Sequence, residues 1–346
     1  MNAGGEQDQP PVLSARNLHV TFPGRRGREP ARAVDGVNLD VHPSEILALV
    51  GESGCGKTTL ARTLMGPERP SGGEVRFAGV PLDYSTPSLR AYRRRVQLVL
   101  QDPTGSLNPR HTVYEAVAEG LRIHGSGALG SFGGEEAKVA DALSRAGLRP
   151  PERFFPRYPH ELSGGQRQRV VIAGALVLDP RVIVADEPVA SLDASVRGEI
   201  LKLLLALRDD SGLSALVVTH DLGLAWNVAD RVAVMYLGRI VETGPVETIL
   251  ASPEHPYTRA LLSVASAGAG SPPLILSGEP PDPTRIPAGC RFHPRCPALA
   301  SGAAGAAGVE PACRGVDPGV LPGGRDATVA CHLFVPFSKN RGSRGF

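Results

Sequence analysis

A glycine-rich segment of the chain has the residue types and spacing of a phosphate-binding loop. It reads GESGCGKT from Gly51 to Thr58 and matches the pattern G-x-x-x-x-G-K-[ST] in full. Glycines let backbone N–H groups turn toward an anion, the amine of Lys57 can reach the β- and γ-phosphates, and the hydroxyl of Thr58 can bind Mg²⁺. We therefore assign nucleotide binding to Gly51, Glu52, Ser53, Gly54, Cys55, Gly56, Lys57, Thr58 and Thr59.

Two adjacent carboxylates lie where a second apolar segment ends. Asp186 and Glu187 follow the apolar residues 182–185 and precede Pro188. Asp186 has the position of a residue that holds Mg²⁺ or its bound water, and Glu187 can act as a base toward an attacking water. Alone, such a pair could instead cap the N-terminus of a helix. The phosphate-binding loop earlier in the chain favours the catalytic interpretation.

A second anion-binding pattern lies between these two motifs. Residues 162–166 read LSGGQ and precede the apolar residues 170–178, which have the character of a helix. Ser163 is a suitable helix N-cap, and Gly164 and Gly165 expose backbone N–H groups at a helix N-terminus. One chain does not need two γ-phosphate sites unless a second copy supplies the nucleotide.

The elements that must position these motifs follow an α/β pattern. From about residue 12 to residue 264 the chain alternates short apolar runs with helical periods, which predicts a largely parallel sheet. Strands are expected at residues 46–50, 96–100, 182–185, 215–219 and 232–236. Helices are expected at residues 59–64, 136–146, 170–178 and 194–208.

Composition excludes several classes of protein. The 346 residues include 41 glycines and 32 prolines, an excess that predicts many turns and a poorly structured stretch. A hydrophobic content of 42% excludes a fully disordered chain, and a net charge of +2 gives no reason to expect nucleic acid as a partner. The N-terminus does not resemble a signal peptide, and no apolar run is long enough to span a bilayer. Five cysteines indicate a reducing compartment rather than a disulfide scaffold.

Changes in sequence character divide the chain into three parts. Residues 1–11 are polar and are expected to form a flexible terminus. Residues 12–265 carry the motifs and form the expected nucleotide-binding domain, with a helical part at about 102–178. Residues 266–346 are rich in proline and glycine, contain four of the five cysteines, and have too few apolar residues for a core of their own.

The LSGGQ string, together with the two motifs around it, resembles the signature of the ATP-binding-cassette ATPases. The resemblance covers about residues 12–262 and implies a P-loop NTPase (RecA-like) core with an antiparallel β subdomain and an α-helical signature subdomain, binding ATP and Mg²⁺. It also implies further site residues. These are Phe22 for stacking on adenine, Gln101 for contacting Mg²⁺ or water, Asp193 in the loop 191–193 that faces the opposite subunit, and His220 near the γ-phosphate.

The resemblance implies a mechanism in which two cassettes pack head to tail. The loop from Gly51 to Thr59 would bind ATP in cis, and Ser163, Gly165 and Gln166 would contact the γ-phosphate in trans. Glu187 would polarise the attacking water, and His220 would position it. This arrangement accounts for the second anion-binding pattern in one chain.

Several longer strings resemble the ATPases of oligopeptide, dipeptide and nickel importers. They lie at residues 101–109, 158–163 and 255–262 and in the extension after residue 266. The resemblance implies two membrane permeases, a second ATPase subunit and an extracytoplasmic binding protein as partners, with the cassette on the cytoplasmic face of the membrane. The alternatives are a soluble cassette ATPase in DNA repair or translation, an exporter, or an importer of nickel chelates or glutathione rather than peptides.

The cysteines of the extension are candidate metal ligands. They are Cys290, Cys296, Cys313 and Cys331. Their spacing does not match a zinc ribbon, although four thiolates could hold zinc or an iron–sulfur cluster, or remain free or paired. Resemblance to the importer ATPases favours a [4Fe–4S] cluster, although an Ala/Gly-rich run at 298–308 separates Cys313 from Cys296 more widely than in that family. Cys55 occupies a variable position of the phosphate-binding loop and has no assigned metal role.

Overall fold

The computed structural model describes residues 10–24, 29–100, 102–125, 134–190, 192–265, 273–279, 282–324 and 326–334. The strands are β1 (Leu13–Phe22), β2 (Ala31–Val41), β3 (Ile46–Val50), β4 (Gly72–Phe77), β5 (Val80–Pro81), β6 (Val96–Val99), β7 (Val182–Asp186), β8 (Ser214–Thr219), β9 (Arg231–Tyr236), β10 (Arg239–Pro245), β11 (Leu321–Pro322) and β12 (Thr328–Val329).

The helices are α1 (Lys57–Leu64), α2 (Thr86–Arg95), α3 (Pro103–Ser106), α4 (Val113–His124), α5 (Glu135–Arg145), α6 (Gly164–Leu176), α7 (Ala194–Ser211), α8 (Leu222–Val228), α9 (Val246–Ala251), α10 (Pro256–Ala265), α11 (Pro297–Ala300), α12 (Ala303–Ala306) and α13 (Glu310–Gly315). Short 3₁₀ turns are η2 (Pro151–Arg153), η3 (Pro159–Glu161) and η4 (His293–Arg295). Within the described residues, no helix combines the length and apolar character needed to cross a bilayer.

The main sheet has the order β11-β12-β10-β9-β3-β8-β7-β6. Its strands β9, β3, β8, β7 and β6 are parallel, which confirms the expected α/β fold and all five expected strands to within one residue at each end. Because the phosphate-binding loop, Glu187 and His220 each follow one of these strands, the parallel arrangement brings them to one edge of the sheet. The register places Val50 beside Thr219, and Asp186 beside Val218.

The central strand β3 is buried on both faces because it separates two hydrophobic cores. Leu47 and Leu49 pack with β1, β2 and α1 in one core, and Ile46 and Ala48 pack with the helices of the opposite face. All five of its residues are buried, as expected for a parallel strand covered on both sides. The strand therefore holds the start of the phosphate-binding loop rigidly.

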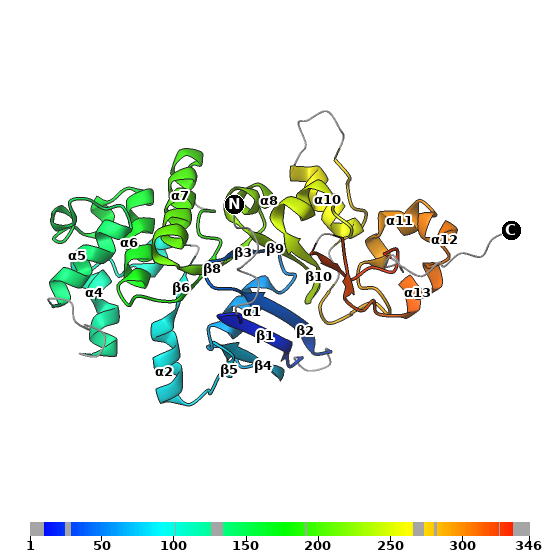
Figure 1. Cartoon of the computed structure of the whole chain (residues 1–346), viewed down its shortest axis with the longest axis horizontal. Coiled ribbons are helices and arrows are strands. Elements are labelled where there is room, and N and C mark those ends of the chain that lie inside the picture. The colour runs from blue at the N-terminus through cyan, green and yellow to red at the C-terminus, as the bar shows by residue number, and fades with distance from the viewer. Residues whose placement is uncertain are drawn as a thin grey trace.

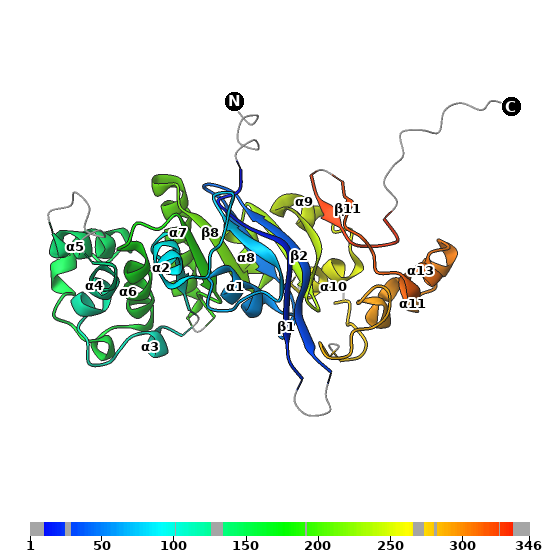
Figure 2. The ribbon, with the colours of Figure 1, turned by 90° about the horizontal axis from the view of Figure 1, so that it is seen from below.

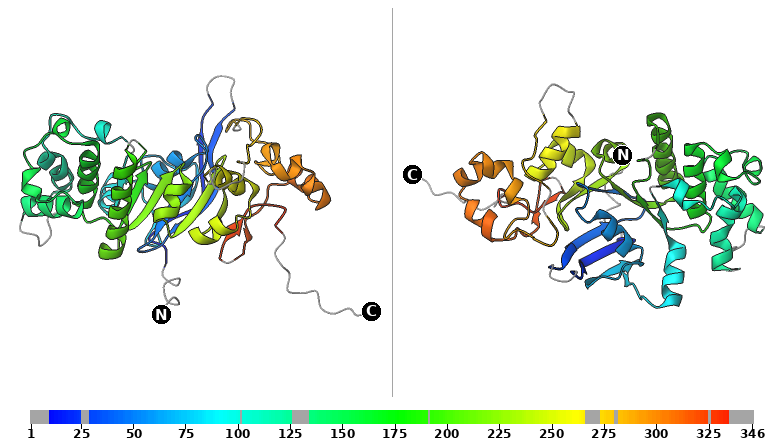
Figure 3. Two further views of the ribbon diagram at one scale, coloured as in Figure 1. Left: turned by 90° about the horizontal axis from the view of Figure 1, so that it is seen from above. Right: turned by 180° about the vertical axis from the view of Figure 1, so that it is seen from behind.

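A separate antiparallel sheet covers one side of the parallel strands. Its order is β2-β1-β4-β5, and the right-hand view of Figure 3 shows this blue and cyan sheet beside the main one. The helices α4, α5 and α6 form a subdomain at the far end of the molecule (Figure 1), within the expected range of about 102–178. A capping box formed by Thr112 and Glu115 begins α4, because each side chain accepts a hydrogen bond from the other residue's backbone N–H.

The extension lies at the end opposite the helical subdomain (Figure 2) and adds strands to the main sheet. Strand β12 pairs with β10, placing Val329 beside Glu242, and β11 pairs with β12. Phe292 is 1% exposed and packs edge-on against Tyr236, with ring centroids 5.1 Å apart. The extension thus shares the core of the preceding residues instead of building one, and the Ala/Gly-rich run forms α11 and α12. A boundary near residue 266 marks a change in sequence character, whereas the packing is continuous across it.

Candidate nucleotide-binding site

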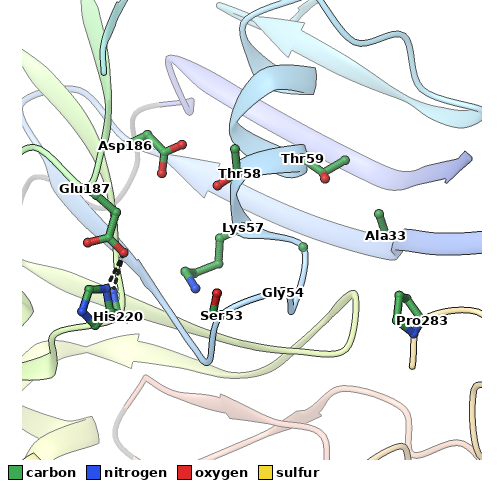
Figure 4. A pocket seen from close by; sticks show the side chains of 11 residues that line it. Ala33, Ser53, Gly54, Lys57, Thr58, Thr59, Asp186, Glu187, His220 and Pro283 are labelled. Carbon is green, nitrogen blue, oxygen red and sulfur yellow. Dashed lines mark hydrogen bonds and ion pairs between the residues drawn. The ribbon is translucent and has the colours of Figure 1, made fainter. Parts of the chain in front are cut away.

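A pocket of about 480 Å³ opens at the carboxyl edge of the parallel strands. Figure 4 shows it from close by. Its lining residues are Ala33, Ser53, Gly54, Gly56, Lys57, Thr58, Thr59, Asp186, Glu187, His220 and Pro283. The structure therefore brings together six residues of the phosphate-binding loop, both carboxylates and the histidine, although β3, β7 and β8 are widely separated in the chain. Glu52 and Cys55 belong to the same loop and line an adjoining pocket.

The phosphate-binding loop follows β3 and leads directly into α1, as its motif requires. Gly56 has a φ of 111°, and a Cβ at this position would lie 2.1 Å from the carbonyl oxygen of Ala33. Only glycine fits there, because the loop passes directly against β2. The Nζ of Lys57 donates to the carbonyl oxygens of Gly51, at 2.7 Å, and of Glu52, at 3.0 Å. The amine thus lies over the loop at the wall of the pocket.

Thr58 and Asp186 form the part of the pocket suited to a divalent cation. Asp186 ends β7, and its side chain hydrogen-bonds that of Thr58. Burial raises the pKa of Asp186, and the nearby charge of Glu187 adds to this, while Thr58 and Lys57 oppose it. A hydroxyl and a carboxylate are the oxygen donors that Mg²⁺ prefers beside phosphates. These two side chains therefore fit the expected Mg²⁺ site.

Glu187 and His220 lie side by side at one wall of the pocket (Figure 4). The Nδ1 of His220 lies 2.6 Å from Oε1 of Glu187, and the backbone N–H of His220 donates to the same oxygen at 3.2 Å. Glu187 has a φ of 51°, and its N–H donates to the carbonyl oxygen of Val218 at 2.9 Å. This left-handed backbone turns the carboxylate out of the strand direction and toward His220 (Figure 4).

The signature residues lie outside this pocket. Ser163 caps α6, since its Oγ accepts from the N–H of Gln166 at 3.2 Å and Oε1 of Gln166 accepts from the N–H of Ser163 at 3.0 Å. A Cβ on Gly165 would lie 2.6 Å from Cγ1 of Val196 in α7. The signature and Asp193, which precedes α7, therefore lie side by side on a surface away from the chain's own phosphate-binding loop. Gly164 lies beside the segment that precedes α7, because a Cβ on Gly164 would be 3.7 Å from Cδ2 of Leu192.

Phe22 and Gln101 are not placed in the pocket, and Gly51 is not among its lining residues either. Phe22 ends β1 and is 38% exposed, but it is not among the lining residues. It pairs with Ala31 at the end of the β1–β2 hairpin where the two strands are connected, whereas Ala33, two residues further along β2, lines the pocket. Gln101 lies outside the described residues.

The pocket also has walls that the sequence motifs do not indicate. Pro283 lines it from the extension, and its carbonyl oxygen accepts from the N–H of Arg32 at 3.1 Å. Ala33 has no feature in the sequence that distinguishes it from other strand residues. The same holds for Pro283, since it lies in a proline-rich stretch more than 200 residues from the loop that it approaches.

Comparison with known proteins agrees with this geometry. The profile of the ABC transporter family matches residues 34–190, and that of the oligopeptide/dipeptide transporter C-terminal region matches residues 241–301. The dipeptide transport ATP-binding protein DppF of Haemophilus influenzae is 42% identical over 300 residues, covering 84% of this chain and 90% of that protein. The chain belongs to the ABC transporter family. It is therefore an ATPase, as expected.

Two further matches describe how this cassette relates to others. The glutathione import ATP-binding protein GsiA of Escherichia coli is 47% identical over 284 residues, which cover 79% of this chain but only 44% of that protein. The dimeric post-hydrolysis structure of the ATP-binding cassette MJ0796, bound to ADP and Pi, has a TM-score of 0.59 and 31% identity, covering 68% of this chain and 98% of that one. These matches confirm the expected family resemblance and the P-loop NTPase fold.

The four cysteines of the cassette's extension line one small cavity, with Phe292 and His255 among its other walls. The backbone N–H of Cys290 donates to the carbonyl oxygen of Cys313 at 3.0 Å, so α11 and α12 loop out without separating these two residues. All five cysteines are among the described residues and have free thiols, so none is in a disulfide. Across the described part of the chain, no three His, Cys, Asp or Glu side chains are arranged to hold one metal ion.

Burial favours the protonated form of the Cys290 and Cys331 thiols. It raises the pKa of Cys290 to about 12 and that of Cys331 to about 11, and repulsion from the other cysteines of the cavity adds to both effects. Binding of any metal centre there would require loss of these protons.

Proposed function

We propose that this cassette is the ATP-hydrolysing subunit of an importer for peptides or a related small solute. The observation that carries the proposal is the presence, in one chain, of a pocket lined by the phosphate-binding loop, Asp186, Glu187 and His220, and of a match to the C-terminal region of oligopeptide/dipeptide transporters. The named relatives for dipeptide transport and glutathione import support the same solute class.

The pocket residues have separate roles in ATP hydrolysis. The loop from Gly51 to Thr59 binds the phosphates through backbone N–H groups and Lys57. Thr58 and Asp186 would hold Mg²⁺, which would neutralise phosphate charge. Glu187 accepts a proton from the attacking water. His220, whose Nδ1 lies 2.6 Å from Oε1 of Glu187, orients the water and stabilises the charge that develops in the transition state. Phe22 stacks on adenine, and Gln101 contacts the metal or water and relays the state of the site to a membrane partner.

The signature residues act on a nucleotide held by a second cassette. Ser163, Gly165 and Gln166 lie at the N-terminus of α6, next to Asp193 and away from the pocket of their own chain. A head-to-tail pair would place this positive helix end against the γ-phosphate of the partner's ATP. The dimeric form of the MJ0796 cassette supports this arrangement.

The partners follow from the proposed role. They are two membrane permeases, a second cassette that is either identical or similar, and an extracytoplasmic binding protein, with this chain on the cytoplasmic face of the membrane. Cycles of ATP-driven closure and opening of the cassette pair would power the permeases. The alternative solutes are nickel chelates and glutathione.

Uptake measurements in cells test this proposal. Cells that depend on this cassette are supplied with a labelled dipeptide, labelled glutathione or a labelled nickel chelate, and uptake is compared between wild type and Glu187→Gln. Glu310→Gln is the matched control, because Glu310 is a partly exposed residue of α13 that pairs with Arg314. We expect dipeptide uptake to fall to background in Glu187→Gln and to stay normal in the control.

Two experimental outcomes would lead to a different functional assignment. Loss of glutathione or nickel uptake with normal dipeptide uptake would reassign the solute. ATP hydrolysis that is stimulated by DNA or ribosomes, with all three uptakes unchanged by Glu187→Gln, would favour the soluble cassette ATPase in repair or translation.

We further propose that the cavity of the extension holds a [4Fe–4S] cluster on Cys290, Cys296, Cys313 and Cys331. Four free thiols around one cavity support it, and a cluster can bind thiols that are too far apart for a single ion, because each binds a different iron. Iron and sulfide analysis of anaerobically purified protein should give close to four of each. Stoichiometric zinc in colourless protein, or no metal at all, would overturn this assignment.

A further inference from the structure

The extension reaches the phosphate-binding loop through one arginine. Both terminal nitrogens of Arg295, in η4, donate to the carboxylate of Glu52, at 2.8 Å to Oε2 and 3.2 Å to Oε1. The side chain of Arg295 is 8% exposed and that of Glu52 is 24% exposed. Two parallel bonds from a planar guanidinium fix the orientation of a carboxylate more tightly than one bond to an amine does.

Glu52 is held by contacts from inside the loop and by two partners outside it, Tyr257 and Arg295. Its backbone N–H donates to the hydroxyl of Tyr257 at 2.8 Å, and its carbonyl oxygen accepts from Nζ of Lys57 at 3.0 Å. Tyr257 lies in α10 and is fully buried. With Arg295 on the carboxylate, the second residue of the phosphate-binding loop is clamped between the loop itself, α10 and the extension.

The charge of Glu52 makes this clamp electrostatically important. Burial raises the pKa of the Cys55 thiol, and the charge of Lys57 lowers it. The carboxylate of Glu52 raises this pKa further, so the negative charge of Glu52 acts on groups inside the loop. An unpaired carboxylate there would repel a triphosphate and compete with it for the amine of Lys57. Arg295 neutralises that charge where the phosphates are to bind.

We propose that Arg295 is a positioning residue of the nucleotide site, which acts through Glu52 to hold the phosphate-binding loop open for the phosphates. It does not line the pocket, so it has no direct contact with the reacting atoms. Pro283, in the same extension, lines the pocket itself. The extension is therefore part of the nucleotide site of its own chain. This inference rests on the proposed role of the loop in ATP binding.

The inference predicts a change in nucleotide affinity rather than in the chemical step. Loss of the paired charge in Arg295→Gln should weaken ATP binding and raise KM for ATP about tenfold, whereas kcat at saturating ATP stays within about twofold. Arg295→Lys keeps the charge but not the fork, and should weaken binding about threefold. Arg314→Gln is the matched control, because Arg314 is an exposed arginine of the extension that pairs with Glu310.

The experiment uses the full purified chain. Affinity for ATP is measured by calorimetry without Mg²⁺, KM and kcat are measured with Mg²⁺, and thermal unfolding is recorded for each variant. A double-mutant cycle adds Glu52→Gln, alone and combined with Arg295→Gln. If Arg295 acts through Glu52, the arginine substitution should change affinity less than twofold once Glu52 is already glutamine.

Each outcome of these measurements either supports or contradicts the role of Arg295 in ATP binding. A wild-type chain that does not bind ATP would overturn the proposed site as a whole, whereas normal ATP affinity in Arg295→Gln would overturn only the role of Arg295. An equal loss of affinity in both backgrounds of the cycle would show that Glu52 is not the link. If Arg295→Gln does not fold, Arg295→Lys carries the test, and an affinity equal to wild type in that variant contradicts the bidentate clamp.

Discussion

At the scale of single residues, the nucleotide pocket is a set of ionisable side chains whose positions are fixed by hydrogen-bond partners. Asp186 is buried enough for its pKa to be raised, yet it has Thr58 as a hydrogen-bond partner. Glu187 has His220 as a close partner at 2.6 Å and an unusual backbone conformation that directs it there. Such a carboxylate is suited to accept a proton from water, whereas Asp186 is suited to a metal ion.

Glu187→Gln should separate ATP binding from hydrolysis. An amide keeps the size and the hydrogen bond to the N–H of His220 but cannot accept a proton from water. We expect ATP affinity within about twofold of wild type and turnover reduced by about 10²-fold or more. Phosphate release and calorimetric ATP binding measure the two effects. Normal turnover in this variant would remove Glu187 from the role of base.

At the scale of elements, close approach between the phosphate-binding loop and its neighbours decides which residues the loop tolerates. Gly56 passes against β2, and Gly51 passes against β9, where a Cβ would lie 2.2 Å from the carbonyl oxygen of Met235. The loop is thus held between two strands, one from each sheet. Its conformation depends on the packing of those sheets as well as on its own residues.

Gly56→Ala should damage the loop more than Gly54→Ala, although both glycines have positive φ. The φ is 111° at Gly56 and 78° at Gly54, so each alanine is strained, but only at Gly56 does the new Cβ meet another backbone atom. We expect Gly56→Ala to lower the free energy of unfolding by about 2 kcal/mol or more and to abolish ATP binding. Gly54→Ala should lower both the free energy of unfolding and the ATP affinity less.

Urea unfolding and calorimetric ATP binding compare the two alanine variants. Because backbone strain is common to both, the difference between them measures the close approach to β2. Equal losses in the two variants would mean that backbone strain alone, and not contact with Ala33, requires glycine at position 56.

At the scale of the whole molecule, the extension is bound to the cassette by buried ion pairs as well as by Phe292. Arg291 pairs with Asp35 of β2 and donates to the carbonyl oxygen of Leu237 at 2.6 Å. Burial would raise the pKa of Asp35, but the hydrogen bond and charge of Arg291, with help from Arg239 and His19, hold it below its ordinary value. This pair connects the first sheet to the last part of the chain.

The Asp35 pair predicts a defined dependence of stability on pH. Because the pKa of Asp35 is lower in the folded chain, its contribution is present above the ordinary aspartate value of about 4 and is lost as pH falls through the folded pKa. Asp35→Asn should therefore lower the free energy of unfolding by about 2 kcal/mol at neutral pH, and this difference should shrink between about pH 5 and about pH 3.

Urea unfolding of wild type and Asp35→Asn at a series of pH values measures this difference. Asp317→Asn is the matched control, since Asp317 forms a more exposed pair with Arg239 at 2.7 Å and should cost less than about 1 kcal/mol. If the difference in free energy of unfolding between wild type and Asp35→Asn does not change with pH, the Asp35–Arg291 pair does not stabilise the docked extension through charge.

The sequence alone determined the parts of this protein that depend on contiguous residues. The phosphate-binding loop with its strand and helix, the caps of the signature helix, the carboxylates at the end of β7 and the parallel strands are all encoded in local patterns of apolarity, glycine and capping residues. The expected helix at 136–146 forms as Glu135–Arg145, and the one at 194–208 begins at Ala194 and continues to Ser211. Local stereochemistry is sufficient for such elements.

Only the tertiary structure decided how distant segments complete the site. Arg295 and Glu52 are 243 residues apart in the chain, and nothing near either residue indicates the other. Tertiary packing likewise places Pro283 at the pocket, β12 in the main sheet and the four cysteines around one cavity. The physical reason is that the extension cannot bury enough apolar surface by itself, so its conformation is set by the cassette surface onto which it packs.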